Sequence, residues 1–188
     1  MTRPKNLLLI GRPGIGKTTA LLKVAELMRD YRRGGFVTRE VRVGARRVGF
    51  QIETFGGAVG TLAHVARDSG PRVGKYHVDV AEFERVGVTA LEQAVVAADV
   101  IFLDEIGKME LFSERFRAAV LRALNCSKPV LATVMIHPHP FVDGLKRRQD
   151  VKLIEVTLAN RDRLPNELCT ELVRLAAGSS SGCGNGPS

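Results

Sequence analysis

The chain has 188 residues, 45% of them apolar, and a formal net charge of +8 at pH 7. This length suits a single domain with a complete hydrophobic core, and no apolar run is long enough to cross a bilayer. The three cysteines, Cys126, Cys169 and Cys183, are far apart and odd in number, which argues against a disulfide framework or a zinc site. We therefore expect a cytoplasmic monomer without a membrane segment.

The first predicted element is a buried strand at Leu7–Ile10, directly before a glycine-rich loop. Residues Gly11–Thr18 read GRPGIGKT and match the phosphate-binding pattern G-x-x-x-x-G-K-[ST] at every constrained position. Thr19–Arg29 follows with apolar residues at helical spacing. A glycine-rich turn can match by chance, but a strand before the loop and an amphipathic helix after it favour a nucleoside-triphosphate site.

The chemistry of this loop predicts a role for each residue type. Glycines let the backbone N–H groups curl around the phosphates, while Lys17 contacts the β- and γ-phosphates and Thr18 contacts Mg²⁺, the predicted cofactor. The predicted nucleotide-binding residues are Gly11, Arg12, Pro13, Gly14, Ile15, Gly16, Lys17, Thr18 and Thr19.

The positive charge is concentrated in the segment that contains this loop. Residues 1–50 hold 12 lysines and arginines against 3 acidic residues, whereas residues 51–188 hold 16 against 17. RNA is one candidate polyanion, but the chain has no tryptophan and two tyrosines, so side chains that stack on bases are scarce. We expect a nucleoside triphosphate, rather than a nucleic acid, to be the anionic partner.

A β-hairpin is predicted after the first helix, which Gly34-Gly35 is expected to end. Phe36–Val43 and Val48–Phe55 alternate apolar and polar residues, and a glycine-containing turn joins them. Gly56-Gly57 then closes the unit.

The rest of the chain alternates predicted strands and helices, which implies an α/β fold with a mostly parallel central sheet and helices on both faces. His137 and His139 are separated by prolines that mark a loop, so a metal site there is disfavoured. Residues 1–177 form one predicted domain, and the Gly/Ser-rich residues 178–188 form a predicted disordered tail. The predicted strands are Lys75–Asp79, Val100–Leu103, Pro129–Ile136 and Leu153–Thr157, and the predicted helices are Ala81–Ala98, Phe112–Leu124 and Arg163–Ala177.

Asp104 and Glu105 follow the fully apolar run Val100–Leu103, which is typical of a strand buried on both faces. In this Walker B arrangement Asp104 supports Mg²⁺ through a bound water, and Glu105 can orient and deprotonate the attacking water. An acidic strand end without chemistry is the alternative. A switch GTPase is disfavoured, because D-x-x-G at Asp104–Gly107 has no N-K-x-D companion in the chain.

Further cations are needed to meet the charge that builds on a transferring phosphoryl group. Thr133 lies in a predicted strand, where it either senses the γ-phosphate or is an ordinary strand threonine. Spacing alone does not choose among the candidate cations, which are Arg42, Arg46, Arg47, Lys108, Lys146, Arg147 and Arg148.

Several segments together resemble the cancer-related nucleoside-triphosphatase family, which is also known from thermophiles. The resemblance covers about residues 5–175, and its most specific block is DEIGKMEL at residues 104–111. The other segments that carry it are Gly11–Thr18, Gly35–Thr38 with Glu40–Arg42, Arg46–Phe50, Gly74–Tyr76 with Val78–Asp79, Asp150–Lys152 and Thr157–Arg161.

The resemblance implies a RecA-like, three-layer P-loop fold and Mg²⁺-dependent hydrolysis of ATP, GTP, CTP and UTP with little base selectivity. It also implies that Glu105 is the general base and that Lys108 and Arg148 face the phosphates beside Lys17. Asn160-Arg161 is implied to approach the base of the nucleotide.

Two rival hypotheses remain open from the sequence. P-loops and basic lid loops such as Lys146–Arg148 also occur in nucleotide and small-molecule kinases, which transfer the γ-phosphate to an acceptor. The second rival is an RNA-associated module that uses ATP as a conformational ligand, which stimulation of turnover by RNA would favour.

Overall fold

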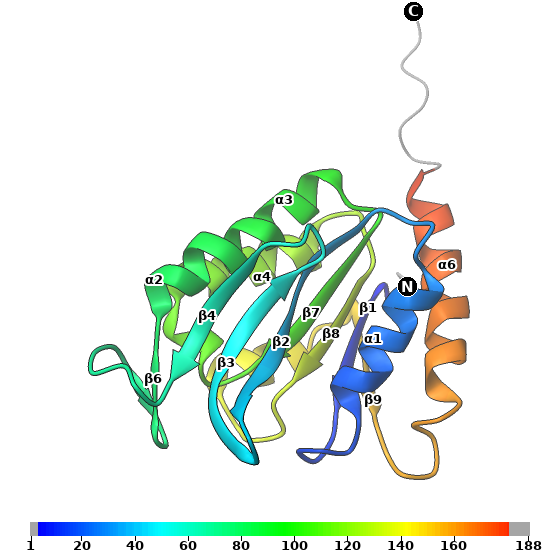
Figure 1. Ribbon diagram of the computed structural model, residues 1–188. Helices are drawn as coiled ribbons and strands as arrows, with labels where there is room; N and C mark the ends of the chain where they lie inside the picture. The colour runs from blue at the N-terminus through cyan, green and yellow to red at the C-terminus, as the bar shows by residue number, and fades with distance from the viewer. Residues whose placement is uncertain (1–3, 181–188) are drawn as a thin grey trace, which may run out of the picture.

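The computed structural model describes residues 4–180, which form a nine-stranded sheet with helices on both faces (Figure 1). The strand order is β5-β6-β4-β3-β2-β7-β8-β1-β9. The strands are β1 (Asn6–Ile10), β2 (Arg33–Val43), β3 (Arg46–Thr54), β4 (Val59–His64), β5 (Arg72–Val73), β6 (Tyr76–Val78), β7 (Val100–Ile106), β8 (Val130–Val134) and β9 (Val151–Glu155). The helices are α1 (Lys17–Leu27), α2 (Val80–Phe83), α3 (Thr89–Ala97), α4 (Glu114–Asn125), α5 (Pro140–Lys146) and α6 (Leu164–Ser180), with a π-helical turn at Glu84–Val88 and a 3-10 turn at Glu110–Phe112.

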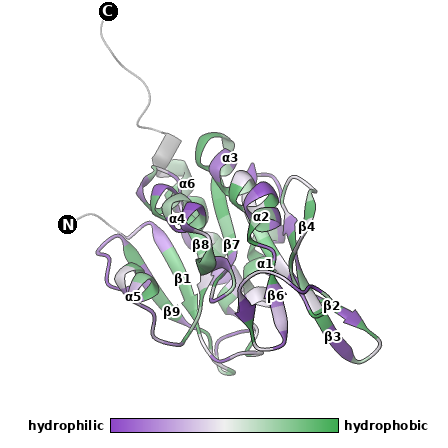
Figure 2. Ribbon diagram, turned by 90° about the vertical axis from the view of Figure 1, so that its left-hand side faces the viewer, coloured by the Kyte–Doolittle hydropathy of each residue, from purple (hydrophilic) through white to green (hydrophobic). Residues whose placement is uncertain are grey.

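The two faces of the sheet are covered by different helices. α1 and α6 pack on one face against residues such as Leu7, Leu9 and Phe102. α2, α3, α4 and α5 pack on the other face against residues such as Leu8 and Ile101. Neighbouring residues along a strand point to opposite faces, so the central strands are mostly apolar, as the hydrophobic colour along them in Figure 2 shows. The predicted three-layer α/β fold is confirmed.

The parallel half of the sheet, β2-β7-β8-β1-β9, brings the carboxyl ends of its strands to one edge. The loop after β1 and the acidic end of β7 therefore lie at the same edge, with β8 between their strands. In Figure 1 the loops after β1 and β9 and the tip of the β2–β3 hairpin all lie along the lower edge of the molecule. Ligands of parallel α/β sheets bind at this edge, so the fold places the predicted site where it is expected.

The predicted hairpin extends the sheet, because its first strand, β2, pairs in parallel with β7 and antiparallel with β3. β4, β6 and β5 continue the antiparallel half, so the sheet is more evenly mixed than the mostly parallel sheet that was predicted. β4 was not predicted, because its buried positions Gly60, Leu62 and Ala63 include only one large apolar residue and its first apolar residue, Val59, is exposed.

Gly34 and Gly35 lie inside β2, which corrects the prediction that they end the first helix; α1 ends earlier, at Leu27. A Cβ on Gly34 would collide with Ala94 of α3. Gly35 has a φ of +98°, and a Cβ there would collide with the carbonyl oxygen of Phe102 on β7. The glycine pair therefore permits close packing of β2 against a helix and a neighbouring strand.

We expect Gly35→Ala to lower the free energy of unfolding by roughly 3 kcal/mol or more, because backbone strain adds to an overlap that the sheet cannot relieve. Gly44→Ala is the matched control, since Gly44 also has a positive φ, of +58°, but its chain neighbours aside, residues 4–180 place no heavy atom within 4 Å of its Cβ position. The control should lose only about 1 kcal/mol. Urea denaturation of both variants measures the difference, and equal losses would contradict this explanation.

Two further segments differ from the predictions. The predicted loop after β8 contains the short helix α5, and Nδ1 of His139 caps it by accepting a hydrogen bond from the backbone N–H of Phe141 at 3.2 Å. Residues 178–180 belong to α6, which corrects the predicted start of the tail at residue 178, and residues 181–188 lie outside the described residues. Within residues 4–180, no helix is long and apolar enough to cross a membrane.

Candidate active site

The loop between β1 and α1 has the backbone shape of a phosphate-binding loop. Gly14 and Gly16 adopt φ values of +74° and +111°, which favour glycine. Lys17 begins α1, and its Nζ atom donates a hydrogen bond to the carbonyl oxygen of Gly11, 3.1 Å away. The ammonium group of Lys17 and the first N–H groups of α1 therefore make this end of the helix favourable for an anion.

The carboxylate of Asp104 is the centre of a hydrogen-bond network at the end of β7. Oγ1 of Thr18 lies 2.9 and 3.0 Å from its two oxygens, and Oγ1 of Thr133 donates to Oδ1 at 2.6 Å. Burial raises the pKa of Asp104, while the two hydroxyl groups and the charge of Lys17 lower it. Thr133 is thus a hydrogen-bond partner of Asp104.

The side chain of Glu105 lies beside this network and is less buried than that of Asp104. Burial raises its pKa, the positive charge of Lys17 lowers it, and the negative charge of Asp104 raises it again. A carboxylate with a raised pKa is a stronger base once it is ionised. Glu105 therefore has the electrostatic surroundings of a general base.

A cavity of about 690 Å³ joins these groups. It extends from the loop after β1, past the end of β7, to the β2–β3 hairpin. A smaller cavity of about 270 Å³ between β9 and α6 contains none of the predicted site residues. The predicted catalytic, nucleotide-binding and metal-binding residues that line the larger cavity are Gly11, Pro13, Gly14, Lys17, Thr18, Asp104, Glu105 and Lys108.

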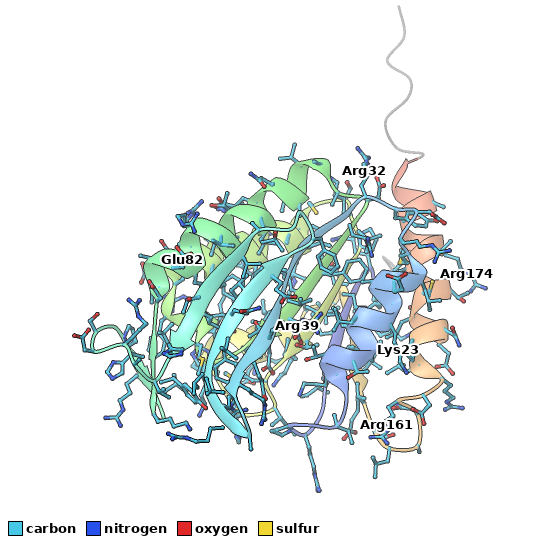
Figure 3. All side chains as sticks on the ribbon, in the orientation of Figure 1. Lys23, Arg32, Arg39, Glu82, Arg161 and Arg174 are labelled. Carbon is cyan, nitrogen blue, oxygen red and sulfur yellow. The ribbon has the colours of Figure 1, made fainter. Side chains whose placement is uncertain are left out.

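The remaining nucleotide-binding predictions fall in and beside the loop. Arg161 lies in the loop after β9, and its Cδ atom is 3.9 Å from the position that a Cβ on Gly16 would occupy. Figure 3 shows Arg161 at the lower edge of the molecule, beside the loop that precedes α1. Arg12, Ile15 and Thr19 belong to the loop and the first helical turn, and they are not lining residues of the cavity.

Arg148 is not brought to the site, which corrects the prediction that it faces the phosphates. Its Nε and Nη2 atoms each lie 2.8 Å from a carboxylate oxygen of Asp150, and Nη2 also donates to Asn125 at 2.7 Å. Asp150 in turn accepts a hydrogen bond from Asn6 at 3.0 Å. Because Asn6 and Val151 are paired at the start of β1 and β9, Arg148 lies a strand length, about 17 Å, from the phosphate-binding loop.

We expect Arg148→Ala to leave kcat and KM within about twofold, and to lower the free energy of unfolding by about 1–3 kcal/mol, as for loss of a half-buried charged pair. Arg148 holds the pKa of Asp150 below its usual value, so this stabilisation is present at neutral pH and is lost as the pH falls through the folded-state pKa. Unfolding of both proteins at pH 7 and at low pH tests this: the difference should shrink in acid. A large loss of kcat would contradict this placement and would support a role for Arg148 in the active site.

Thr38 and Glu110, which line the cavity, carried no role in the sequence-based prediction. Thr38 donates a hydrogen bond from Oγ1 to the backbone oxygen of Asp104 at 2.8 Å, which ties β2 to β7. Glu110 is buried beside Gly107, and burial together with the charges of Glu105 and Asp104 raises its pKa to about 8. Thr38 could have been found from the sequence, because Thr38 and Glu40 are alternate residues of the predicted strand and so share one face. Glu110 could not, because a single glutamate in a turn belongs to no periodic pattern.

Comparisons with known sequences agree with this geometry. Residues 6–169 match a family model described as NTPase. The chain is 53% identical over 180 residues to the nucleoside-triphosphatase THEP1 of Thermofilum pendens, an alignment that covers 92% of this chain and 98% of the relative. It is 43% identical over 166 residues to the THEP1 of Thermotoga maritima, covering 88% and 94% of the two chains.

Two solved structures have the same fold. The crystal structure of THEP1 from Aquifex aeolicus matches with a TM-score of 0.81 and 37% identity, covering 89% of this chain and 98% of that chain. The solution structure of a human cancer-related nucleoside triphosphatase matches with a TM-score of 0.76 and 36% identity, covering 90% and 96%.

Proposed function

Because the chain belongs to the NTPase family, we propose that it hydrolyses nucleoside 5′-triphosphates to nucleoside diphosphate and phosphate in a Mg²⁺-dependent reaction. The relatives are named as nucleoside-triphosphatases, which supports a hydrolase and gives no support to the kinase alternative. The observation that carries the proposal is the cavity that joins Lys17, Thr18, Asp104 and Glu105.

The residues of this cavity suit in-line hydrolysis. Lys17 and the N–H groups of the loop hold the β- and γ-phosphates. Glu105 accepts a proton from the attacking water as the water oxygen bonds to the γ-phosphorus. The bond between the γ-phosphorus and the β–γ bridging oxygen breaks, and the diphosphate leaves. Lys108, which lines the cavity, stays a proposed contact of the γ-phosphate.

The donor atoms of Thr18 and Asp104 fit Mg²⁺. A hydroxyl oxygen and carboxylate oxygens lie 2.9–3.0 Å apart at the mouth of the phosphate-binding loop, and oxygen is the ligand that Mg²⁺ prefers. Thr18 and Asp104 would hold the ion, Asp104 through a water. When bound, Mg²⁺ would neutralise charge on the β- and γ-phosphate oxygens.

We expect little selectivity for the base of the nucleotide, because the proposed contacts are mainly to its phosphates. The side chains and N–H groups assigned above bind phosphate oxygens, which are the same in every nucleoside triphosphate. Arg161 beside Gly16 is the proposed neighbour of the base, and a guanidinium can stack on any base. We therefore propose ATP, GTP, CTP and UTP as substrates.

The test is phosphate release from the four triphosphates, each with Mg²⁺ and each after chelation of the ion. We expect values of kcat/KM within about tenfold of one another, and loss of turnover on chelation. Turnover of a single triphosphate would contradict low selectivity, and undiminished turnover after chelation would contradict the Mg²⁺ requirement.

A further inference from the structure

We propose that Arg47 is a catalytic residue, whose guanidinium contacts the γ-phosphoryl group from the side of the cavity opposite the phosphate-binding loop. This inference rests on the proposed function. It names the residue that supplies a second positive charge to the transferring group, in addition to Lys17.

The structure separates Arg47 from the other candidate cations. Arg47 and Lys108 line the cavity, whereas Arg42 and Arg46, the neighbouring hairpin arginines, are not lining residues. Lys146 lies 3.6 Å from Asp143 in α5, Arg147 does not line the cavity, and Arg148 lies at the opposite edge of the sheet. Arg47 and Lys108 are therefore the two candidates in reach of the cavity.

Arg47 is held in place by three neighbouring side chains. Its Nη1 atom lies 2.5 Å from Oε1 of Glu40, and its Nε atom donates to the hydroxyl group of Tyr76 at 2.9 Å. The guanidinium also lies over the ring of Phe50, 5.0 Å from its centre. These hydrogen bonds use Nε and Nη1, so within residues 4–180 Nη2 remains to donate to a ligand. A pre-positioned guanidinium loses little further entropy when it binds a phosphoryl oxygen.

β2, whose residue Glu40 binds Arg47, is hydrogen-bonded to β7, the strand that contains the proposed base Glu105. Thr38 and Glu40 lie two residues apart on β2, so their side chains share a face, and both line the cavity. Thr38 is hydrogen-bonded to the backbone of Asp104, and Glu40 binds Arg47 about 7 Å further along the strand. In the sheet, the neighbouring strands run in the order β3-β2-β7-β8-β1. Arg47 lies on β3 and Lys17 follows β1, so the two cations approach the cavity from opposite sides of β7, which carries Asp104 and Glu105.

The local charge balance also favours an anionic ligand. Glu40 accepts hydrogen bonds from both Arg42 and Arg47, and these two arginines hold the pKa of Glu40 below its usual value. One carboxylate therefore meets two guanidinium groups, and the cluster keeps a net positive charge. The γ-phosphoryl group, which gathers charge on its equatorial oxygens during transfer, is the ligand chemistry that this surplus suits.

The experiment compares Arg47→Ala with Arg46→Ala and measures binding of ATP and of ADP without turnover, by calorimetry, and kcat separately. Arg46 is the matched control, because it is the neighbouring hairpin arginine, is exposed and does not line the cavity. We expect Arg47→Ala to weaken ATP binding about tenfold or more, as for loss of a charged hydrogen bond, and to leave ADP binding within twofold. We expect kcat to fall about 100-fold or more, and Arg47→Lys to restore part of the preference for ATP.

ADP binding by Arg47→Ala also reports that the variant is folded. Equal weakening of ATP and ADP, or an equal effect of Arg46→Ala, would overturn the assignment, since a structural role does not distinguish the two nucleotides. If the wild-type chain bound ATP without hydrolysing it, the proposed function would fail, while the ratio of ATP to ADP affinity would still decide whether Arg47 contacts the γ-phosphate.

Discussion

Glu105→Gln is expected to lower the rate of phosphate release by about 10²–10⁴-fold and to leave nucleotide affinity within a few-fold of wild type. Glutamine keeps the shape of the side chain but cannot accept the proton of the attacking water. The proposed phosphate contacts of Lys17 and the loop do not involve Glu105, so we expect binding to persist. Single-turnover kinetics with ATP, together with calorimetric binding, separates the two effects.

Glu114→Gln is the matched control for this substitution. Glu114 lies at the start of α4, and its side chain is 89% exposed. The control should therefore keep wild-type turnover. If Glu105→Gln turned over as fast as the control, the base would be another group, and the assignment of Glu105 would be wrong.

Lys17→Ala is expected to weaken ATP binding and to reduce kcat/KM by about 10³-fold or more, because an ammonium group that meets both ground-state and transition-state charge is lost. Lys17 also lowers the pKa of Glu105 and Asp104, so its removal raises the pKa of both carboxyl groups and makes each harder to ionise. The measurement is kcat/KM for ATP at a fixed Mg²⁺ concentration.

Lys23→Ala serves as the control on the same helix. Lys23 is exposed on α1 and is labelled in Figure 3, away from the lower edge of the sheet. We expect its kcat/KM within twofold of wild type. An equal loss in Lys23→Ala and Lys17→Ala would show that the charge of the helix, rather than contact by Lys17, governs the reaction.

The parts of the site that lie in one continuous segment could be predicted from the sequence. The apolar runs that become β1 and β7 are each followed directly by their functional residues, and parallel strands bring these ends to one edge. The Thr18–Asp104 contact joins the two segments there. Local pattern and general topology were sufficient for this half of the site.

The parts that depend on long-range pairing could not be predicted. Lys146–Arg148 resembles a basic lid in sequence, but the register of β9 against β1 places Arg148 at the amino ends of the strands. The selection of Arg47 over Arg42 and Arg46 depends on the register of β2 against β3 and on Tyr76 from β6. Gly34-Gly35 reads as a helix stop, and only the packing of α3 and β7 shows why these glycines lie in a strand.

The most direct test of the proposed hydrolysis is the measurement of products from ATP with Mg²⁺ and no acceptor, comparing the wild-type chain with Lys17→Ala. We predict that the wild type forms ADP and phosphate in equal amounts and that Lys17→Ala stays near background. Binding of ATP by the wild type without phosphate release, or equal release by both proteins, would contradict hydrolysis at this site.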